Sequence, residues 1–169
     1  MSMLPVVIVD DEIDSINATV NFIRNRWANR DIATYLDLDE AGEALIERKE
    51  PFILLLDHDF KGRSDDFKGE MLARVLRRRH PWGLILPICY LSGRFDDKEW
   101  RDLTEENAHL APTSYVRKGT RNIADLVEHL EMLFLAAQAS WQEQQMLAVV
   151  DADDDLWSEA ALDSEGSSA

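Results

Sequence analysis

The sequence predicts a doubly wound α/β fold, in which helices cover both faces of a five-stranded parallel sheet. Two observations lead to this prediction. Short apolar runs typical of strands alternate along the chain with longer segments of helical periodicity. The run at residues 52–56 (FILLL) has no polar side chain on either face, which is typical of a strand covered on both sides. Parallel neighbours need crossover connections, and the intervening helices provide them.

Five strands are expected, and each is followed by a segment with helical signals. They cover residues 4–9, 31–36, 52–56, 84–91 and 114–117. After the first strand, one helical face is predicted to carry Ile13, Ile16, Val20, Ile23 and Trp27. After the third strand, a second face is predicted to carry Phe67, Met71, Val75 and Leu76. The fourth strand leads to a mostly charged helix over residues 96–110, with Trp100 and Leu103 on it.

Residues 74–80 (RVLRRRH) form a basic run on the helix that follows the third strand. We interpret them as the solvated side and end of that helix, because cations stabilise helix C-termini. A nucleic-acid surface is the less favoured interpretation of this run.

The last helix is predicted to be unusually long. Its apolar pattern begins after Arg121 and can continue to about residue 150. Thirty helical residues span about 45 Å, which is longer than a domain of this size. We therefore predict one domain at residues 1–138, followed by a helix extension and an acidic tail at 139–169. Residues 151–169 hold seven acids and no lysine or arginine.

The composition limits the classes of partner. Among 169 residues, 33 acidic and 18 basic side chains give a net charge of −15, which repels nucleic acid and anionic membranes. Protein partners or cations are expected instead. The single cysteine, Cys89, cannot form an internal disulfide, and neither a membrane span nor a signal peptide is found in the sequence. A cytoplasmic protein is predicted.

Polar side chains follow four of the predicted strands. Strand one ends at Asp10 and Asp11, strand three at Asp57, strand four at Ser92 and strand five at Lys118. In doubly wound folds, ligands bind at the carboxyl ends of the strands, near the point where strand order reverses. The predicted fold therefore brings these five side chains to one edge of the sheet.

The chemistry of this group predicts a phosphoryl-transfer site. Neighbouring carboxylates repel one another unless a cation lies among them, and Mg²⁺ is the ordinary partner of oxygen ligands. Magnesium and Lys118 together could hold a phosphoryl group on Asp57, with Ser92 donating a hydrogen bond to one of its oxygens.

This arrangement resembles the receiver domains of two-component response regulators over about residues 4–138. The resemblance rests on the paired acids, the aspartate after strand three, the Ser-Gly pair after strand four and the lysine after strand five. Tyr115, three residues before Lys118, matches the switch aromatic of that family. The resemblance implies the flavodoxin-like receiver fold and, since no output domain follows, a stand-alone receiver.

The resemblance also implies roles for the acids. Asp57 would accept phosphate from the phosphohistidine of a histidine kinase or a phosphotransfer protein. Asp11 would bind Mg²⁺ directly, Asp10 directly or through water, and Asp59 through its main-chain carbonyl.

Two further roles belong to the switch. Ser92 and Lys118 would bind the phosphoryl group. Movement of Ser92 would let Tyr115 turn inward, which alters the surface that such domains present to a downstream protein target.

Several positions depart from the family pattern. Gly119 stands where the family usually has a proline after the lysine, and Lys61 replaces another common proline. The loop from residue 57 to 69 is longer than usual. Asp59 and Arg94 occupy the two variable positions that tune access of water to the phosphoryl group, and an ion pair between them is one arrangement to expect.

Two other functions remain open. One is a degenerate receiver that acts as a phosphorylation-independent interaction module. The other is a haloacid-dehalogenase-like phosphohydrolase, since the residues Asp57-His58-Asp59 fit its Asp-x-Asp motif and further acids follow at 153–155. The leading interpretation is a signalling domain rather than a turnover enzyme. Its output would be a partner protein, onward phosphotransfer or a homodimer through the long last helix.

Overall fold

A computed structural model describes residues 4–61, 69–93, 97–106 and 113–118, and separate positions from Leu126 to Glu143. The chain divides into two compact units, Met1–Ala137 and Gln138–Ala169. The sheet, the helices and the candidate site all belong to the first unit, which is described here by itself.

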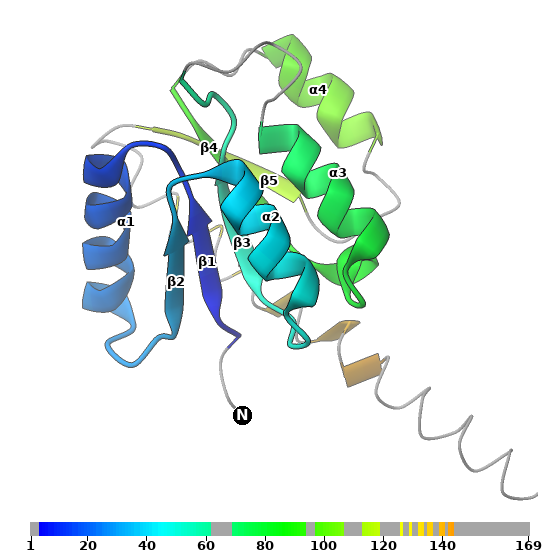
Figure 1. The fold of residues 1–169 in the computed structure, drawn as a ribbon, viewed down its shortest axis with the longest axis horizontal. Coiled ribbons are helices and arrows are strands. Elements are labelled where there is room, and N and C mark those ends of the chain that lie inside the picture. Colours follow the sequence, from blue (N-terminus) through cyan, green and yellow to red (C-terminus); the bar gives the residue numbers. More distant parts are fainter. Residues whose placement is uncertain are drawn as a thin grey trace, which may run out of the picture. The chain divides into compact units, whose positions relative to one another are not determined.

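The first unit is built on a five-stranded parallel sheet in the order β2-β1-β3-β4-β5. The strands are β1 (Val6–Val9), β2 (Ile32–Tyr35), β3 (Ile53–Asp57), β4 (Ile88–Ser92) and β5 (Thr113–Arg117). From β1 the chain crosses to β2 on one side and then to β3 on the other, so strand order reverses between β1 and β3 (Figure 1). The predicted fold class is confirmed.

Helices cover both faces of the sheet, and each face has its own core. The helices are α1 (Ile13–Arg26), α2 (Leu38–Glu47), α3 (Gly69–Arg79) and α4 (Asp97–Glu106). Alternate strand residues pack against α2 and α3 on one face, where these two helices lie side by side (Figure 1). The other strand residues pack against α1 and against Leu126 and Leu133. This two-sided burial explains why the central strands β1, β3 and β4, which are buried throughout, are largely apolar.

The fourth strand begins later than predicted. It starts at Ile88, and Gly83–Ile85 form a short 3₁₀ helix instead. Gly83 packs against the end of α3: a Cβ there would lie 2.4 Å from the carbonyl oxygen of Leu76 and 2.5 Å from that of Arg77. The close approach turns the chain before the strand can start.

The predicted helical faces are partly wrong. On α1, Ile16 and Ile23 are buried, but Ile13 is 53% exposed. On α3, Leu76 is buried as expected, whereas Met71 is 46% exposed. Leu72 and Ala73 face the core beside it, and Val75 is half-buried. Phe67 lies outside the described residues. A spacing of three and four residues fits both the predicted face with Met71 and Val75 and a neighbouring face with Leu72 and Leu76. Tertiary packing buries the second face, which is displaced by about one residue.

The basic run at the end of α3 is not wholly solvated. Arg77 is buried and donates hydrogen bonds to the carbonyl oxygens of Gly83, at 2.8 Å, and Leu86. Burial lowers the pKa of Arg77 to about 10. His80 is also buried, and its ring meets that of Phe52 edge to face. Arg77 therefore ties α3 to the turn before β4, and the interpretation of the whole run as solvated was wrong.

The predicted C-terminal extension falls largely outside the described residues, as does the acidic tail. The separate positions from Leu126 to Glu143 are helical. None of the helices in the described part of the chain combines the length and apolarity that a membrane span requires.

Candidate functional site

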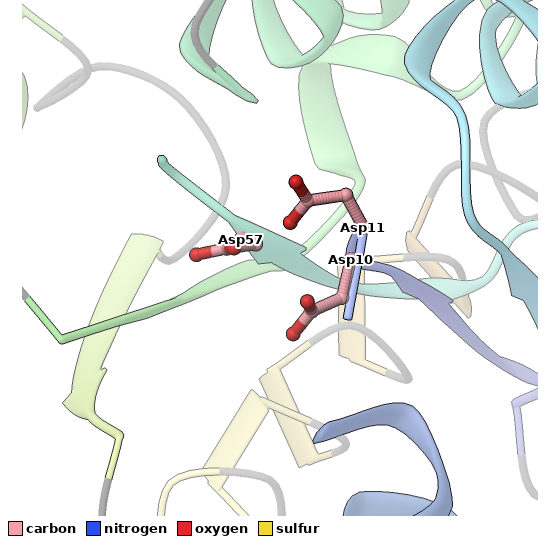
Figure 2. A group of neighbouring side chains, drawn as sticks. All are labelled: Asp10, Asp11 and Asp57. Carbon is pink, nitrogen blue, oxygen red and sulfur yellow. The ribbon is translucent and has the colours of Figure 1, made fainter. Parts of the chain in front are cut away.

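The register of the sheet brings the strand-end acids together. Val9 of β1 is paired with Leu56 of β3. The residues that follow them in the chain, Asp10 and Asp57, therefore lie side by side. Both are nearly covered, at 2% and 4% exposed. Figure 2 shows Asp10 and Asp11 leaving the end of β1 with their carboxylates on the same side as Asp57.

The three carboxylates form an acidic cluster. Asp10, Asp11 and Asp57 each offer one oxygen that lies within 4.8 Å of the other two. Asp11 Oδ2 accepts a hydrogen bond of 2.7 Å from the main-chain nitrogen of Lys61. Its Oδ1 is buried without a hydrogen-bond partner in the part of the chain that the structure describes. A buried carboxylate oxygen without a donor is unfavourable, which indicates a place for a cation.

Asp10 is held by the start of α1. Its Oδ1 accepts a hydrogen bond of 2.9 Å from the main-chain nitrogen of Glu12, and its Oδ2 accepts one of 2.6 Å from Ser15 Oγ. These contacts fix its orientation. Ser15 was not predicted, because a serine in the first turn of a helix carries no distinctive sequence signal.

Lys118 bridges two of the acids. Its Nζ lies 2.7 Å from Asp10 Oδ2 and 2.9 Å from Asp57 Oδ2. Its main-chain nitrogen donates to the carbonyl oxygen of Ser92 at 3.0 Å, which fixes the end of β5 beside that of β4. Burial works against the ammonium charge, but the hydrogen bonds to the two carboxylates outweigh it and raise the pKa of Lys118.

The negative charge of ionised Asp57 is only partly balanced by the Lys118 ammonium. Burial raises the pKa of Asp57 from 3.8 to about 6, although the hydrogen bond and charge of Lys118 pull it down. The neighbouring charge of Asp10 raises it further, and a hydrogen bond of 3.4 Å from the main-chain nitrogen of Asp59 lowers it. One ammonium is therefore too little positive charge for this site.

The donor set fits a magnesium ion. Carboxylate oxygens are its preferred ligands, and three of them converge here beside an oxygen that lacks a donor. A bound cation would also lower the pKa of Asp57, which burial raises, because it would stabilise the ionised carboxylate. The residues that would hold the ion are Asp10, Asp11 and Asp57.

Ser92 connects the site to the aromatic residue on β5. Its hydroxyl donates to Asp59 Oδ2 at 3.1 Å, and its main-chain oxygen accepts a hydrogen bond of 3.4 Å from the Tyr115 hydroxyl. The half-buried Tyr115 ring lies 5.6 Å from that of Trp100 on α4. Ser92 thus contacts both Asp59 and the β5 aromatic.

The structure brings together most, but not all, of the predicted site. Asp10, Asp11, Asp57 and Lys118 lie together, and Ser92 and Asp59 lie beside them. Arg94 falls outside the described residues, as do Gly119 and most of the loop at 62–68. One contact near the acidic cluster was missed: the exposed Lys61 ammonium pairs with Glu12, and this carboxylate raises the pKa of Lys61. Residues 49 apart give no sequence signal for such a pair.

Comparison with known proteins gives similarity at the level of structure only. No family model and no curated protein sequence matches the chain. A CheY-like response regulator receiver domain protein from Methanospirillum hungatei JF-1 is 18% identical, with a TM-score of 0.61 over 82% of this chain and 99% of that one. Chemotaxis protein CheY4 from Vibrio cholerae is 17% identical, with a TM-score of 0.62 over 78% and 99%. The signal receiver domain of a modulated diguanylate cyclase from Desulfovibrio desulfuricans G20 is 18% identical, with a TM-score of 0.63 over 82% and 99%.

These similarities show the fold. The chain has the CheY-like, flavodoxin-like fold of response regulator receiver domains, as the sequence predicted. In that fold the acidic cluster lies at the carboxyl ends of the strands, where ligand sites of doubly wound sheets are found.

Proposed function

We propose that this chain is a stand-alone receiver that accepts a phosphoryl group on Asp57 in a magnesium-dependent reaction. The observation that carries the proposal is the Lys118 ammonium between Asp10 and Asp57, in a cluster whose third acid, Asp11, has a buried oxygen without a donor among the described residues. A structural salt bridge would not require the third carboxylate, and that carboxylate makes the site more negative. A bound cation would pair with the carboxylates, and a phosphoryl group on Asp57 would pair with both the cation and the Lys118 ammonium.

The proposed step is an in-line displacement at phosphorus. A carboxylate oxygen of Asp57 forms a bond to phosphorus, while the bond from phosphorus to a histidine nitrogen of the donor protein breaks. The leaving imidazole keeps the electron pair of that bond. Magnesium, when bound, would neutralise charge on the phosphoryl oxygens.

The residues of the chain have distinct parts in this step. Lys118 favours the ionised form of Asp57, and its ammonium is placed to donate hydrogen bonds to phosphoryl oxygens. Ser15 and the main chain of Glu12 hold Asp10 in position. Ser92 would have to leave Asp59 in order to donate to the phosphoryl group.

The proposed output is protein contact. A histidine kinase or phosphotransfer protein would supply the phosphoryl group, and a downstream protein would read the surface around Tyr115 and α4. A cytoplasmic location is also part of this proposal, and pairing of two copies through the C-terminal helix is its alternative output.

The test is incubation with acetyl phosphate and Mg²⁺, followed by intact mass measurement. Wild type should gain one phosphate, and Asp57→Ala should gain none. Asp102→Ala, an exposed aspartate on α4, is the control for loss of an acid and should be labelled like wild type. Absence of label in wild type would contradict the proposal. Repeated hydrolysis of small phosphate esters that is lost in Asp59→Asn would instead support the phosphohydrolase.

A degenerate receiver is the second candidate, and one contact favours it. Asp59 accepts the Ser92 hydroxyl, which the phosphorylated state would need. Beryllofluoride, a mimic of the phosphoryl group, separates the two candidates when it is added with Mg²⁺. An unchanged melting temperature and unchanged chemical shifts would favour the degenerate receiver.

A further inference from the structure

The groove between α2 and α3 is separate from the acidic site. It has a volume of about 460 Å³, and apolar side chains form most of its lining. Its lining residues are Leu38, Asp39, Gly42, Glu43, Ile46, Met71, Leu72 and Val75. Its volume is within the range of pockets that take up ligands or partner side chains.

Two apolar residues on α3 have no role in the core. Met71 is 46% exposed, and Val75 is half-buried, although both belong to the apolar periodicity of the helix. Both line the groove. An exposed methionine beside an apolar groove is common at interaction surfaces, because its flexible side chain adapts to a partner.

Gly42 keeps the groove open in the middle of α2. A Cβ at this position would lie 3.6 Å from Leu72 Cδ1, which is ordinary van der Waals contact. Alanine would therefore fit and would favour the helix, since glycine is a poor helix former. The missing side chain leaves room for one from outside.

The two helices that border the groove carry opposite charges at their exposed positions. Helix α2 bears Asp39, Glu40, Glu43 and Glu47, all exposed, and no lysine or arginine. Helix α3 bears exposed arginines instead. Arg78 and Arg79 follow Val75 by three and four residues, so they continue the face that lines the groove.

We infer that this groove, between the acidic helix α2 and the arginine-bearing end of helix α3, is an interface for a second copy of the chain. A partner must offer apolar side chains together with charges in the reverse order, and the chain itself offers that order. Under a two-fold axis, α2 of one copy faces α3 of the other, so each contact occurs twice. Met71 of each copy enters the groove of its partner beside Gly42.

Other occupants fit the charges less well. A purely basic peptide would meet the arginines of α3. The acidic segment at residues 151–169 of the chain, with seven acids and no lysine or arginine, would be repelled by α2. The net charge of −15 makes two copies repel each other, and physiological salt partly screens this repulsion.

The test is sedimentation equilibrium of the full chain across a wide range of concentration, without a phosphoryl donor. A monomer–dimer equilibrium is expected. Glu43→Arg or Arg78→Glu should each raise the dimer Kd about tenfold, because each pair occurs twice, and the double variant should restore it. Glu105→Arg on α4, exposed and outside the groove, is the matched charge control and should leave the Kd unchanged.

A second pair of variants tests the groove itself. Gly42→Met fills it and should also weaken the dimer about tenfold, whereas Ala44→Met, exposed on α2 outside the groove, should not. Thermal unfolding checks that each variant is folded.

Three results would overturn the inference. The first is a wild type that stays monomeric, and the second is a dimer that is unaffected by the reversals and by Gly42→Met, as a dimer through the C-terminal helix would be. The third is a monomeric chain that binds an amphipathic leucine–lysine peptide in the groove, which would assign the groove to a different protein. The measurement does not involve Asp57, so its outcome is independent of the proposed phosphoryl transfer.

Discussion

Replacement of Asp57 by asparagine should stabilise the magnesium-free protein at neutral and alkaline pH. Burial raises the pKa of this carboxyl from 3.8 to about 6, in spite of the Lys118 ammonium 2.9 Å away. Its ionised form is therefore unfavourable in the folded state. Asparagine has nearly the same shape, stays neutral and can still accept the hydrogen bond from the main-chain nitrogen of Asp59. Lys118 keeps its partner Asp10.

The size of the effect follows from the two pKa values. The pKa rises from 3.8 to about 6, and each pKa unit corresponds to about 1.4 kcal/mol. Ionised Asp57 therefore lowers the free energy of unfolding by about 3 kcal/mol. The sign is that of an acid whose pKa is raised on folding. The folded state binds more protons than the unfolded state between about pH 4 and about pH 6, so stability falls as pH rises through this window and the loss stays constant above it.

The assay is urea unfolding of wild type and Asp57→Asn in a chelating buffer, at several values from about pH 4 to about pH 8. The variant should match wild type at the acid end and exceed it by about 2–3 kcal/mol at the alkaline end. The difference between the two proteins cancels the titration of the other carboxyls. Asp102→Asn, which changes an exposed aspartate on α4, is the control and should show no pH-dependent difference.

Addition of Mg²⁺ completes this experiment. The ion should stabilise wild type by an amount that grows with its concentration, and it should stabilise Asp57→Asn much less. A variant that is less stable than wild type at about pH 8, or a difference that does not change with pH, would refute the reasoning that burial of this charge opposes folding.

Three other substitutions test the rest of the site. Lys118→Ala should slow labelling of Asp57 by acetyl phosphate about 100-fold while Mg²⁺ still binds, as measured by mass and tryptophan fluorescence; an unchanged rate would exclude its role. Gly69→Ala should lower the melting temperature and prevent labelling, because its Cβ would lie 2.0 Å from the main-chain oxygen of Asp57; Gly42→Ala, with its nearest contact at 3.6 Å, is the control and should not destabilise. Asp59→Ala removes the carboxylate that accepts the Ser92 hydroxyl and should speed labelling a few-fold, because Ser92 no longer has to leave Asp59. Slower labelling would show that the contact between Ser92 and Asp59 does not inhibit phosphorylation.

The fold could be predicted because its signal is repeated along the chain. The central strands read as largely apolar runs and the helices between strands supply crossovers, so an error at one boundary does not change the topology. The late start of β4 at Ile88 shows the limit. The turn before it depends on how closely Gly83 approaches the end of α3, which is a tertiary contact between separate segments.

The strand-end acids could be predicted for a related reason. Asp10 directly follows β1 and Asp57 is the last residue of β3, and parallel strands place their carboxyl ends at one edge. The partners that orient them could not be predicted. The hydrogen bonds from Ser15 to Asp10 and from Lys61 to Asp11 depend on the path of loops, for which the sequence has no periodic signal.

The burial of Arg77 was missed for a third reason. Hydrophobic periodicity treats an arginine as a solvated residue, yet this guanidinium satisfies the carbonyl oxygens of Gly83 and Leu86 where the chain turns toward β4. A buried charge is tolerated when it takes up such acceptors. Met71 and Val75 were predicted to lie on the apolar face of the same helix, α3, but Met71 is exposed and Val75 half-buried, and both line the groove.

The contacts of Ser92 link the acidic site to the outer surface of the domain. Its carbonyl oxygen accepts hydrogen bonds from both the Lys118 main chain and the Tyr115 hydroxyl, and its own hydroxyl is held by Asp59. A phosphoryl group on Asp57 would compete with Asp59 for that hydroxyl, because a doubly charged group is the stronger acceptor. Movement of Ser92 toward it would disturb the bond to Tyr115, and the Tyr115 ring lies against Trp100 of α4. A change of charge at the buried acid can therefore reach a surface helix through one residue, which is the coupling that a signalling domain requires.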